Sequence, residues 1–229
     1  MERVMVVLPH PDDETFGCGG TIAKFAKEGA QILYMCGTLG EMGRNMGKPF
    51  FATRETLPDV RARELEEACA VLGIQEIQKM GLRDKTVEFE DAHELANRIR
   101  QEMIRFKPQL LITHFPKYGV HPDHDALGYA AILAVKMLPK DERPLIYAHA
   151  ITHNRMQTLG KPDVEIEIAD VLETKVAAIR AHRSQSEAMM KRWSENTEPD
   201  EAWKKRMDQM MKKEVFWLYD ADRLPETLW

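Results

Sequence analysis

The chain contains 229 residues, with 32 Lys and Arg against 37 Asp and Glu, and carries a formal net charge of -5 at pH 7. Hydrophobic residues make up 44% and charged residues 30%, which is typical of a soluble globular domain and excludes a largely disordered chain. A mildly acidic protein is also a poor general binder of nucleic acids or anionic membranes, so we expect neither as a partner.

Cysteine usage and the hydrophobic runs predict a cytoplasmic protein. Cys18, Cys36 and Cys69 are odd in number and widely spaced, so we expect no disulfide framework. The first apolar run, residues 4–8, is too short for the core of a secretory signal. No stretch of the sequence reaches the roughly 20 apolar residues that cross a bilayer.

The first elements alternate between strands and helices. Residues 3–8 are rich in β-branched side chains and predict a buried strand. A helix is expected next, to about Lys27, and residues 32–36 predict a second strand. The segment from Gly37 to Pro58 is polar and glycine-rich, and loops of that length usually serve a function.

Pro58 suits the first turn of the next helix, whose apolar residues recur at helical spacing as far as Leu72. Residues 76–80 predict a weak strand, an amphipathic helix spans 95–106, and residues 110–113 predict an apolar strand. The expected later elements are a helix to about Leu138, strands at 145–148 and 164–168, a helix from Leu172 running into residues 182–185, a loop around 194–200, a further helix, and a last strand at 215–219.

Strands that alternate with helices in this way predict βαβ units and a mostly parallel sheet covered on both faces. We therefore expect an α/β fold, a Rossmann-like three-layer α/β/α sandwich, with residues 1–229 forming a single domain. Met and Trp residues between 189 and 217 predict core packing, with some of this region available for a subunit contact. A homo-oligomer is the expected assembly.

Two motifs carry the chemistry. His10-Pro-Asp-Asp-Glu14 directly follows the first strand, and His121-Pro-Asp-His124 follows the strand at 110–113. The ends of parallel strands meet at the carboxyl edge of a sheet, where such folds place their sites. Each motif alone has a simpler interpretation, because aspartates are also common first residues of helices. Together, two such motifs after two strands favour a functional site.

Clustered imidazoles and carboxylates indicate a metal. His and Asp three positions apart, or two His three apart, can face the same point. Three N/O ligands with a water are the usual arrangement of catalytic zinc, and spare carboxylates can orient ligands or accept a proton. We expect one Zn²⁺ per chain, with Fe²⁺ as the alternative. Spacing alone leaves open whether Asp12 or Asp13 is the ligand.

These residues resemble a known family. Residues 9–14, Gly17-Cys-Gly-Gly20 and His121-Pro-Asp-His124 are similar to the signature of the zinc-dependent N-acetylglucosaminyl deacetylases, the LmbE-like or PIG-L family. Arg61-x-x-Glu64 and His182-x-Ser-Gln185 resemble two further family elements. Within the family, the chain looks most like the bacillithiol-pathway deacetylases, which act on N-acetylglucosaminyl-malate.

The resemblance implies a role for each motif residue. His10, Asp13 and His124 would hold the metal, and Asp12 would be the general base. His121 would stabilise the oxyanion or protonate the leaving amine, with Asp123 as its orienting partner. The substrate would be a small sugar conjugate.

Other residues are assigned with less support from the pattern. Arg61 would bind sugar hydroxyls or aglycone carboxylates, because the guanidinium fork suits a carboxylate. Glu41 and Tyr118 are further candidates for the pocket wall. Solvated side chains rather than substrate contacts are expected at Arg44, Lys48 and Arg54. No metal-like partner lies near the other histidines, which are therefore not assigned to the site: His93, His114, His149 and His153.

Two other functions remain open from the sequence. Clustered Asp and His residues also suit a two-metal phosphoesterase, although that chemistry needs more carboxylate ligands than these motifs clearly provide. A non-catalytic metal- or sugar-binding protein is the other alternative. Asp12 argues against it, because a binding protein has no use for a general base.

Overall fold

The structure is a computed structural model that describes residues 1–45, 47–195 and 200–228, apart from the side chains at 202–204, 206, 207 and 209. The predicted loop around 194–200 therefore lies mostly outside the described residues. Within them, seven strands form one sheet in the order β3-β2-β1-β4-β5-β7-β6. The strands are β1 (Arg3–Leu8), β2 (Gln31–Cys36), β3 (Glu76–Lys79), β4 (Leu110–His114), β5 (Leu145–His149), β6 (Val164–Glu167) and β7 (Lys213–Leu218).

Helices alternate with these strands along the chain, as the sequence predicts. The helices are α1 (Asp13–Lys27), α2 (Leu57–Leu72), α3 (Ala92–Phe106), α4 (Pro122–Lys136), α5 (Arg155–Thr158), α6 (Leu172–Ala181), α7 (Arg183–Glu195) and α8 (Glu201–Lys212), with short 3-10 turns η1 (Val87–Phe89), η2 (Lys140–Glu142), η3 (Ala169–Val171) and η4 (Ala221–Arg223). One expected helix is interrupted, because His182 leaves the helical conformation (φ -77°, ψ 55°) and separates α6 from α7.

The sheet is parallel from β3 to β5 and antiparallel at its other side. β1 lies between β2 and β4, with Leu8 opposite Cys36 and Val7 opposite Thr113. β7 then runs antiparallel to both β5 and β6. The mostly parallel α/β fold is thus confirmed, while the reversed last strand is a feature that helical and strand periodicity did not predict.

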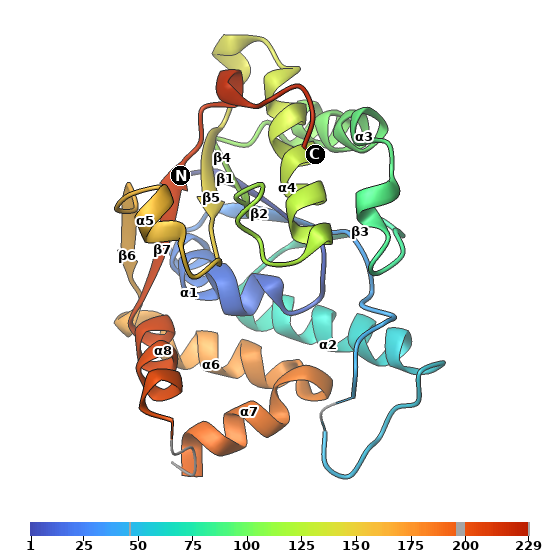
Figure 1. Cartoon of the computed structure of the whole chain (residues 1–229), viewed down its shortest axis with the longest axis vertical. Coiled ribbons are helices and arrows are strands. Elements are labelled where there is room, and N and C mark those ends of the chain that lie inside the picture. Colours follow the sequence, from blue (N-terminus) through green and yellow to red (C-terminus); the bar gives the residue numbers. More distant parts are fainter. Residues whose placement is uncertain (46, 196–199, 229) are drawn as a thin grey trace.

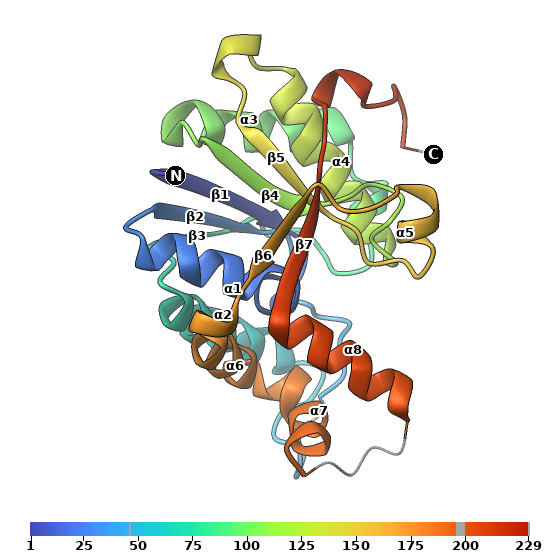
Figure 2. The same ribbon diagram turned by 90° about the vertical axis from the view of Figure 1, so that its left-hand side faces the viewer.

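Helices cover both faces of the sheet, as Figure 2 shows. On one face, alternate β1 side chains such as Met5 and Val7 pack with residues of α3 and α4. On the other face, Val4, Val6 and Leu8 pack with residues of α1, α2 and α6. This alternation is that of a strand buried on both sides, and it produces two apolar layers. After β7 the chain returns to the α4 side, where Leu224 joins the core.

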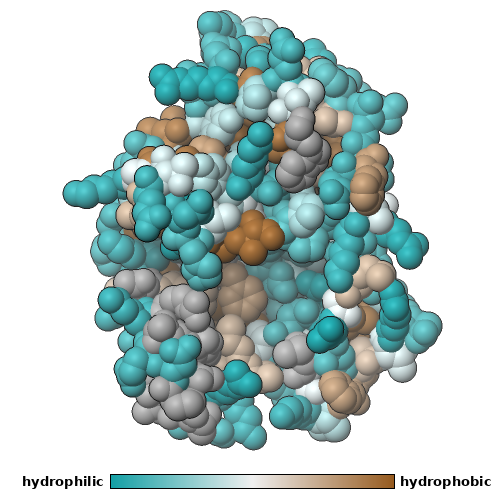
Figure 3. Space-filling view, viewed as in Figure 1, coloured by the Kyte–Doolittle hydropathy of each residue, from teal (hydrophilic) through white to brown (hydrophobic). Residues whose placement is uncertain are grey.

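The surface is mainly hydrophilic on the face drawn in Figure 3, with hydrophobic residues in small separate groups. The helices α6, α7 and α8 lie together below the sheet in Figure 1. None of the helices in the described ranges has the length and apolar character needed to cross a bilayer.

Candidate active site

The two motifs meet because β1 and β4 are neighbouring parallel strands. β1 ends at Leu8, and the turn through His10 leads directly into α1. β4 ends at His114, and its loop leads into α4. Both loops leave the same edge of the sheet, so residues more than a hundred positions apart converge there.

His10, Asp13 and His124 form a compact cluster with low exposure. His10 Nδ1 lies 3.1 Å from His124 Nε2, and the two carboxylate oxygens of Asp13 lie 3.4 and 3.3 Å from these nitrogens. The three side chains are 11–13% exposed. Three N/O donor atoms therefore face one another within 4.8 Å, as a shared cation requires.

In each imidazole, the nitrogen that points away from the cluster has a hydrogen-bond acceptor, which leaves the nitrogen that faces the cluster free to act as a ligand. His124 Nδ1 lies 2.7 Å from the carbonyl oxygen of Gly119, which can only accept, so we assign the proton to Nδ1. His10 Nε2 lies 3.1 Å from Asp123 and 3.3 Å from Asp84, so its proton points to those carboxylates. Such outer hydrogen bonds leave a lone pair on each inner nitrogen and are typical of metal-binding histidines.

The electrostatics of the cluster also favour a cation. Burial raises the pKa of Asp13, but the neighbouring imidazoles outweigh it and hold that pKa well below its usual range. Burial lowers the pKa of His10, but hydrogen bonds to Asp123, Asp13 and Asp84 outweigh it and raise the pKa well above its ordinary value. Asp13 is thus ionised, and the carboxylates around His10 favour a positive charge at the cluster.

Asp12 adopts an unusual backbone conformation beside the cluster. Its φ of 115° lies in the region that favours glycine, and its N–H donates to Glu14 Oε2 at 3.0 Å. The Asp12 side chain is 19% exposed, and Oδ2 lies 3.2 Å from Arg61 Nη2. Burial raises the pKa of Asp12 to about 6, although Arg61 lowers it. Adjacent carboxyls with pKa values pushed apart are typical of acid–base sites.

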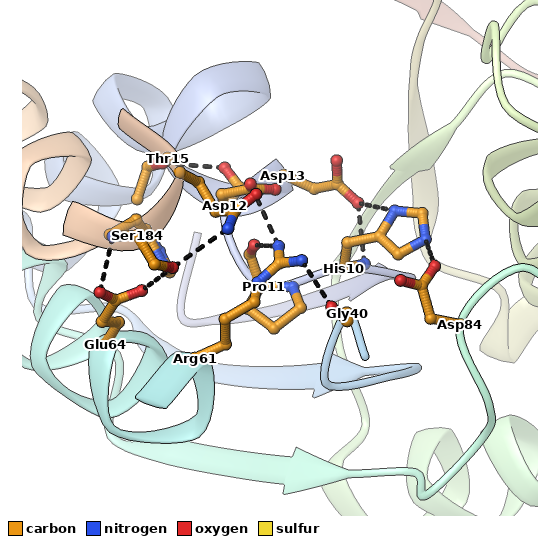
Figure 4. Close-up of polar contacts among 12 residues, drawn as sticks. His10, Pro11, Asp12, Asp13, Thr15, Gly40, Arg61, Glu64, Asp84 and Ser184 are labelled. Carbon is orange, nitrogen blue, oxygen red and sulfur yellow. Dashed lines mark hydrogen bonds and ion pairs between the residues drawn. The ribbon is translucent and has the colours of Figure 1, made fainter. Parts of the chain in front are cut away.

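Arg61 is buried, and Figure 4 shows its guanidinium among Pro11, Asp12 and Gly40. Its guanidinium donates to the carbonyl oxygens of Gly40 and Pro11 as well as to Asp12. Gly40 has a φ of 64°, and a Cβ there would lie 1.8 Å from Arg61 Nη1, so a larger residue would be strained and would displace the guanidinium. Arg61 therefore ties the long loop to the start of α1.

His121 and Asp123 differ from the expected pairing. Asp123 Oδ2 lies 4.0 Å from His121 Nδ1 but 3.1 Å from His10 Nε2, so the Asp123 carboxylate contacts His10 more closely. His121 is instead oriented through the backbone, because its Nδ1 accepts the Asp123 N–H at 3.2 Å. The neutral ring then carries its proton on Nε2. The side chain of His121 is 33% exposed.

The structure adds site residues that the sequence analysis missed. Asp84, after β3, contacts His10 (Figure 4). His114 was left out of the site, yet it is buried, stacks on His124 with ring centroids 4.0 Å apart, and lies 3.7 Å from Asp13. Its place at the end of the predicted strand beside the first motif was the signal that could have found it. Asp84 had no motif to mark it.

His182, between α6 and α7, contacts the glutamate of the first motif. Its Nε2 lies 2.5 Å from Glu14 Oε1, and both side chains are fully buried. Glu14 Oε2 also accepts from Tyr34 Oη at 3.3 Å. The late H-x-S-Q element thus supports the carboxylate that binds the Asp12 N–H. In the same element, Ser184 binds Glu64, as Figure 4 shows.

The two remaining candidates lie in loops. Glu41 lines a cavity of about 350 Å³, and its Oε2 accepts the Asp84 N–H at 3.0 Å. Tyr118 lies between β4 and α4 with its ring edge-on to Phe115. Glu41 is therefore linked to the cluster through Asp84, whereas the observed ring contact of Tyr118 is with Phe115.

Comparisons with known proteins agree on one family. Residues 5–135 match PIG-L, described as GlcNAc-PI de-N-acetylase. The probable N-acetyl-alpha-D-glucosaminyl L-malate deacetylase 2 of Bacillus cereus is 51% identical over 83% of this chain and 87% of its own length, and that of Bacillus subtilis is 46% identical over 95% and 97%. Among solved structures, N,N'-diacetylchitobiose deacetylase from Pyrococcus horikoshii aligns with a TM-score of 0.73 and 25% identity over 99% of this chain and 86% of that one.

Proposed function

The chain belongs to the PIG-L family of metal-dependent N-deacetylases, and from that membership we propose that it hydrolyses the acetamide of N-acetylglucosaminyl-malate in bacillithiol biosynthesis. The relatives at 46–51% identity are named for this substrate, and they match 95% and 83% of this chain, respectively. The observation that carries the proposal is the convergence of His10, Asp13 and His124 beside a further carboxylate, Asp12.

We propose that His10, Asp13 and His124 hold a divalent ion, with zinc as the preferred metal. Two imidazoles and one carboxylate are a common catalytic zinc set, and Fe²⁺ accepts the same donors. When bound, the ion supplies Lewis acidity, which activates water and polarises the acetamide carbonyl. Asp123 and Asp84 orient His10, while the Gly119 carbonyl orients His124.

Asp12 is proposed as the base that accepts the proton of the attacking water. Arg61 holds Oδ2, and Oδ1 makes no hydrogen bond within the described part of the chain, so one oxygen is free to take that proton. The Glu14 contact fixes the Asp12 backbone, which orients the carboxylate before substrate arrives.

His121 is proposed as the donor for the charge that develops on the substrate. Its Nδ1 is occupied by the Asp123 N–H, so Nε2–H is the group that can donate. The half-buried ring lies edge-on to His10 with centroids 5.0 Å apart, which puts this donor at the rim of the cluster. The same proton suits an oxyanion or the leaving amine.

The test is release of free amine and acetate from N-acetylglucosaminyl-malate by purified protein, with and without a chelator. Activity should require the metal. Asp12→Ala should keep stoichiometric zinc and lose turnover by about 10²–10⁴-fold, the usual contribution of a general base. His124→Ala should lose the metal as well. Full turnover by Asp12→Ala, or full zinc occupancy in His124→Ala, would remove that residue from its proposed role.

A second candidate, a two-metal hydrolase, has one observation in its favour. His10 also belongs to a second group of potential ligands, with Asp84, His121 and Asp123. In that group, however, Asp123 accepts the N–H groups of Lys85 and Val87, and Asp84 accepts that of Met42. Both carboxylates therefore already accept backbone hydrogen bonds, which favours a role in orienting His10 over the binding of a second metal ion. Metal analysis should find one ion per chain, and two ions would favour the alternative.

Three further expectations stay predictions of the sequence. They are a single domain over residues 1–229, a homo-oligomeric assembly and a cytoplasmic location.

A further inference from the structure

We propose that Arg54 and Arg83 form a carboxylate-binding subsite next to the metal cluster, which recognises the acidic aglycone of the substrate. This inference rests on the proposed function and assigns the selectivity for an anionic conjugate to two residues outside the family motifs. It also revises the expectation that Arg54 is merely solvated.

The two arginines line the same cavity of about 350 Å³. Its wall comes from the long loop before α2 and from the segment after β3, and it consists of Glu41, Met42, Arg54, Gly81, Leu82 and Arg83. Small-molecule sites usually enclose roughly 300–1,000 Å³, so this cavity suits a small polar group and not a whole oligosaccharide.

Asp84 joins this cavity to the metal cluster. Its backbone N–H donates to Glu41 Oε2 at 3.0 Å, and its Oδ2 accepts the Met42 N–H at 2.8 Å. Its other oxygen lies 3.3 Å from His10 Nε2. One residue thus forms part of the cavity's frame and part of the metal site, so a sugar at the metal can extend its aglycone into the cavity.

The guanidinium groups are available to a ligand. Both arginines are exposed, and across the described ranges neither lies within 4.0 Å of a carboxylate oxygen. Among the described residues, the hydrogen-bond acceptor found for the Arg54 guanidinium is Met42 Sδ, a weak one, at 2.9 Å. A guanidinium without a carboxylate partner keeps its planar set of N–H donors for an incoming carboxylate.

Glu41 and Arg61, two other charged groups near the cavity, already have partners. Glu41, the acid in the cavity wall, accepts backbone N–H groups with both oxygens, from Leu39 and from Asp84. Arg61, expected from the sequence to bind sugar hydroxyls or aglycone carboxylates, donates to Asp12 and to two backbone carbonyls. The anion-binding role therefore falls to the two arginines of the cavity.

The first experiment compares two substrates, N-acetylglucosaminyl-malate and the uncharged methyl N-acetylglucosaminide, in Arg54→Gln, Arg83→Gln and the double variant. Loss of one charged hydrogen bond should lower kcat/KM for the malate conjugate, relative to the neutral glycoside, by roughly 10-fold per substitution, mostly through KM. Arg44→Gln removes the same charge from the same loop but outside the cavity wall, and should leave the ratio unchanged.

A second readout does not depend on turnover. Calorimetric titration of the zinc-loaded protein with free L-malate should show binding that weakens by a similar factor in each cavity variant and not in Arg44→Gln. An unchanged substrate ratio and unchanged malate binding in the double variant would overturn the subsite while leaving deacetylation intact. A wild-type protein that binds malate through these arginines but releases no amine would instead reject the proposed function.

Discussion

At the scale of single residues, the candidate site depends on hydrogen bonds that fix the backbone and side chains of its acidic residues. Asp12 keeps a backbone conformation that costs about 1–3 kcal/mol in a non-glycine residue. The cost is offset locally, because Glu14 accepts the Asp12 N–H and is itself bound by His182. In this conformation the two adjacent carboxylates have different surroundings, with Asp12 beside Arg61 and Asp13 beside His10 and His124.

Asp123→Asn tests the orienting contact on His10. An amide at this position offers an N–H₂ group where a carboxylate oxygen now faces His10 Nε2, so the imidazole loses the closer of the two carboxylates that fix its proton. We expect zinc affinity to fall about 10–100-fold, the usual effect of removing such a partner. Competition with a zinc-binding dye measures this.

The pairing of Asp123 with His121 predicts a different result for the same variant. If Asp123 acts mainly on His121, zinc affinity stays at the wild-type value and only turnover falls. Zinc affinity and turnover together therefore distinguish the Asp123–His10 contact of the structure from the Asp123–His121 pairing that the family resemblance implies.

At the scale of elements, α1 is broken where it passes the end of the sheet. Cys18 leaves the helical conformation (φ -147°), and the N–H groups of Gly20 and Thr21 bind Glu214 of β7 instead of helix carbonyls. Lys175 Nζ of α6 donates to Glu214 at 2.6 Å and also donates to the Phe16 carbonyl oxygen at 3.3 Å. A buried ion pair thus satisfies both sides of the break.

Glu214→Gln should destabilise the fold. Lys175 is fully buried and Glu214 is 4% exposed, so the substitution leaves an unpaired ammonium in the interior. Breaking such a pair costs about 3–5 kcal/mol. Chemical denaturation measures the loss, and adding Lys175→Met should recover part of it because the uncompensated charge is gone. A double variant less stable than Glu214→Gln alone would contradict this explanation.

The sequence predicted most elements because their signals are local. β1 is a run rich in β-branched residues that ends before the Pro9 turn. α2 begins beside Pro58 and ends before Gly73. The direction of β7 depends on pairing with β5 and β6, which leaves no local pattern. The break between α6 and α7 at His182 was not predicted either, because the buried contact of His182 with Glu14 joins residues far apart in the sequence.

The same distinction applies to the site. His10, Asp13 and His124 lie in motifs, so their convergence could be predicted from two strand ends. Asp84 has no motif to mark it, and His114 is marked only by its place at the end of a predicted strand, so the strand order is needed to bring both to the cluster. Whether Asp123 serves His10 or His121 is a matter of about one ångström, which spacing in the sequence does not resolve.

At the scale of the whole molecule, the candidate ligands join the two helical layers. Asp13 begins α1 on one face of the sheet, and His124 lies in the first turns of α4 on the other face (Figures 1 and 2). An ion held by both, with His10 between them, links the layers across the sheet edge. Its binding energy should therefore appear as global stability.

Zinc should raise the stability of the whole fold. At a free zinc concentration 100 times the Kd, linkage predicts about 2.7 kcal/mol of added stability, and a chelator should remove it. Thermal unfolding with and without zinc measures the shift in Tm. His124→Ala should show no zinc-dependent shift, whereas Arg44→Gln should behave as wild type. An equal shift in His124→Ala would place the ion elsewhere.

The position of β7 has a consequence for biosynthesis. This strand lies between β5 and β6, although it is the last strand in the chain. A nascent polypeptide that has emerged only as far as α6 exposes the open edge of β5 and has no strand to hold β6 against it. The β5–β7–β6 part of the sheet can therefore form only after β7 has been synthesised, and a chain released before residue 213 leaves β5 with an unpaired edge, a surface prone to self-association.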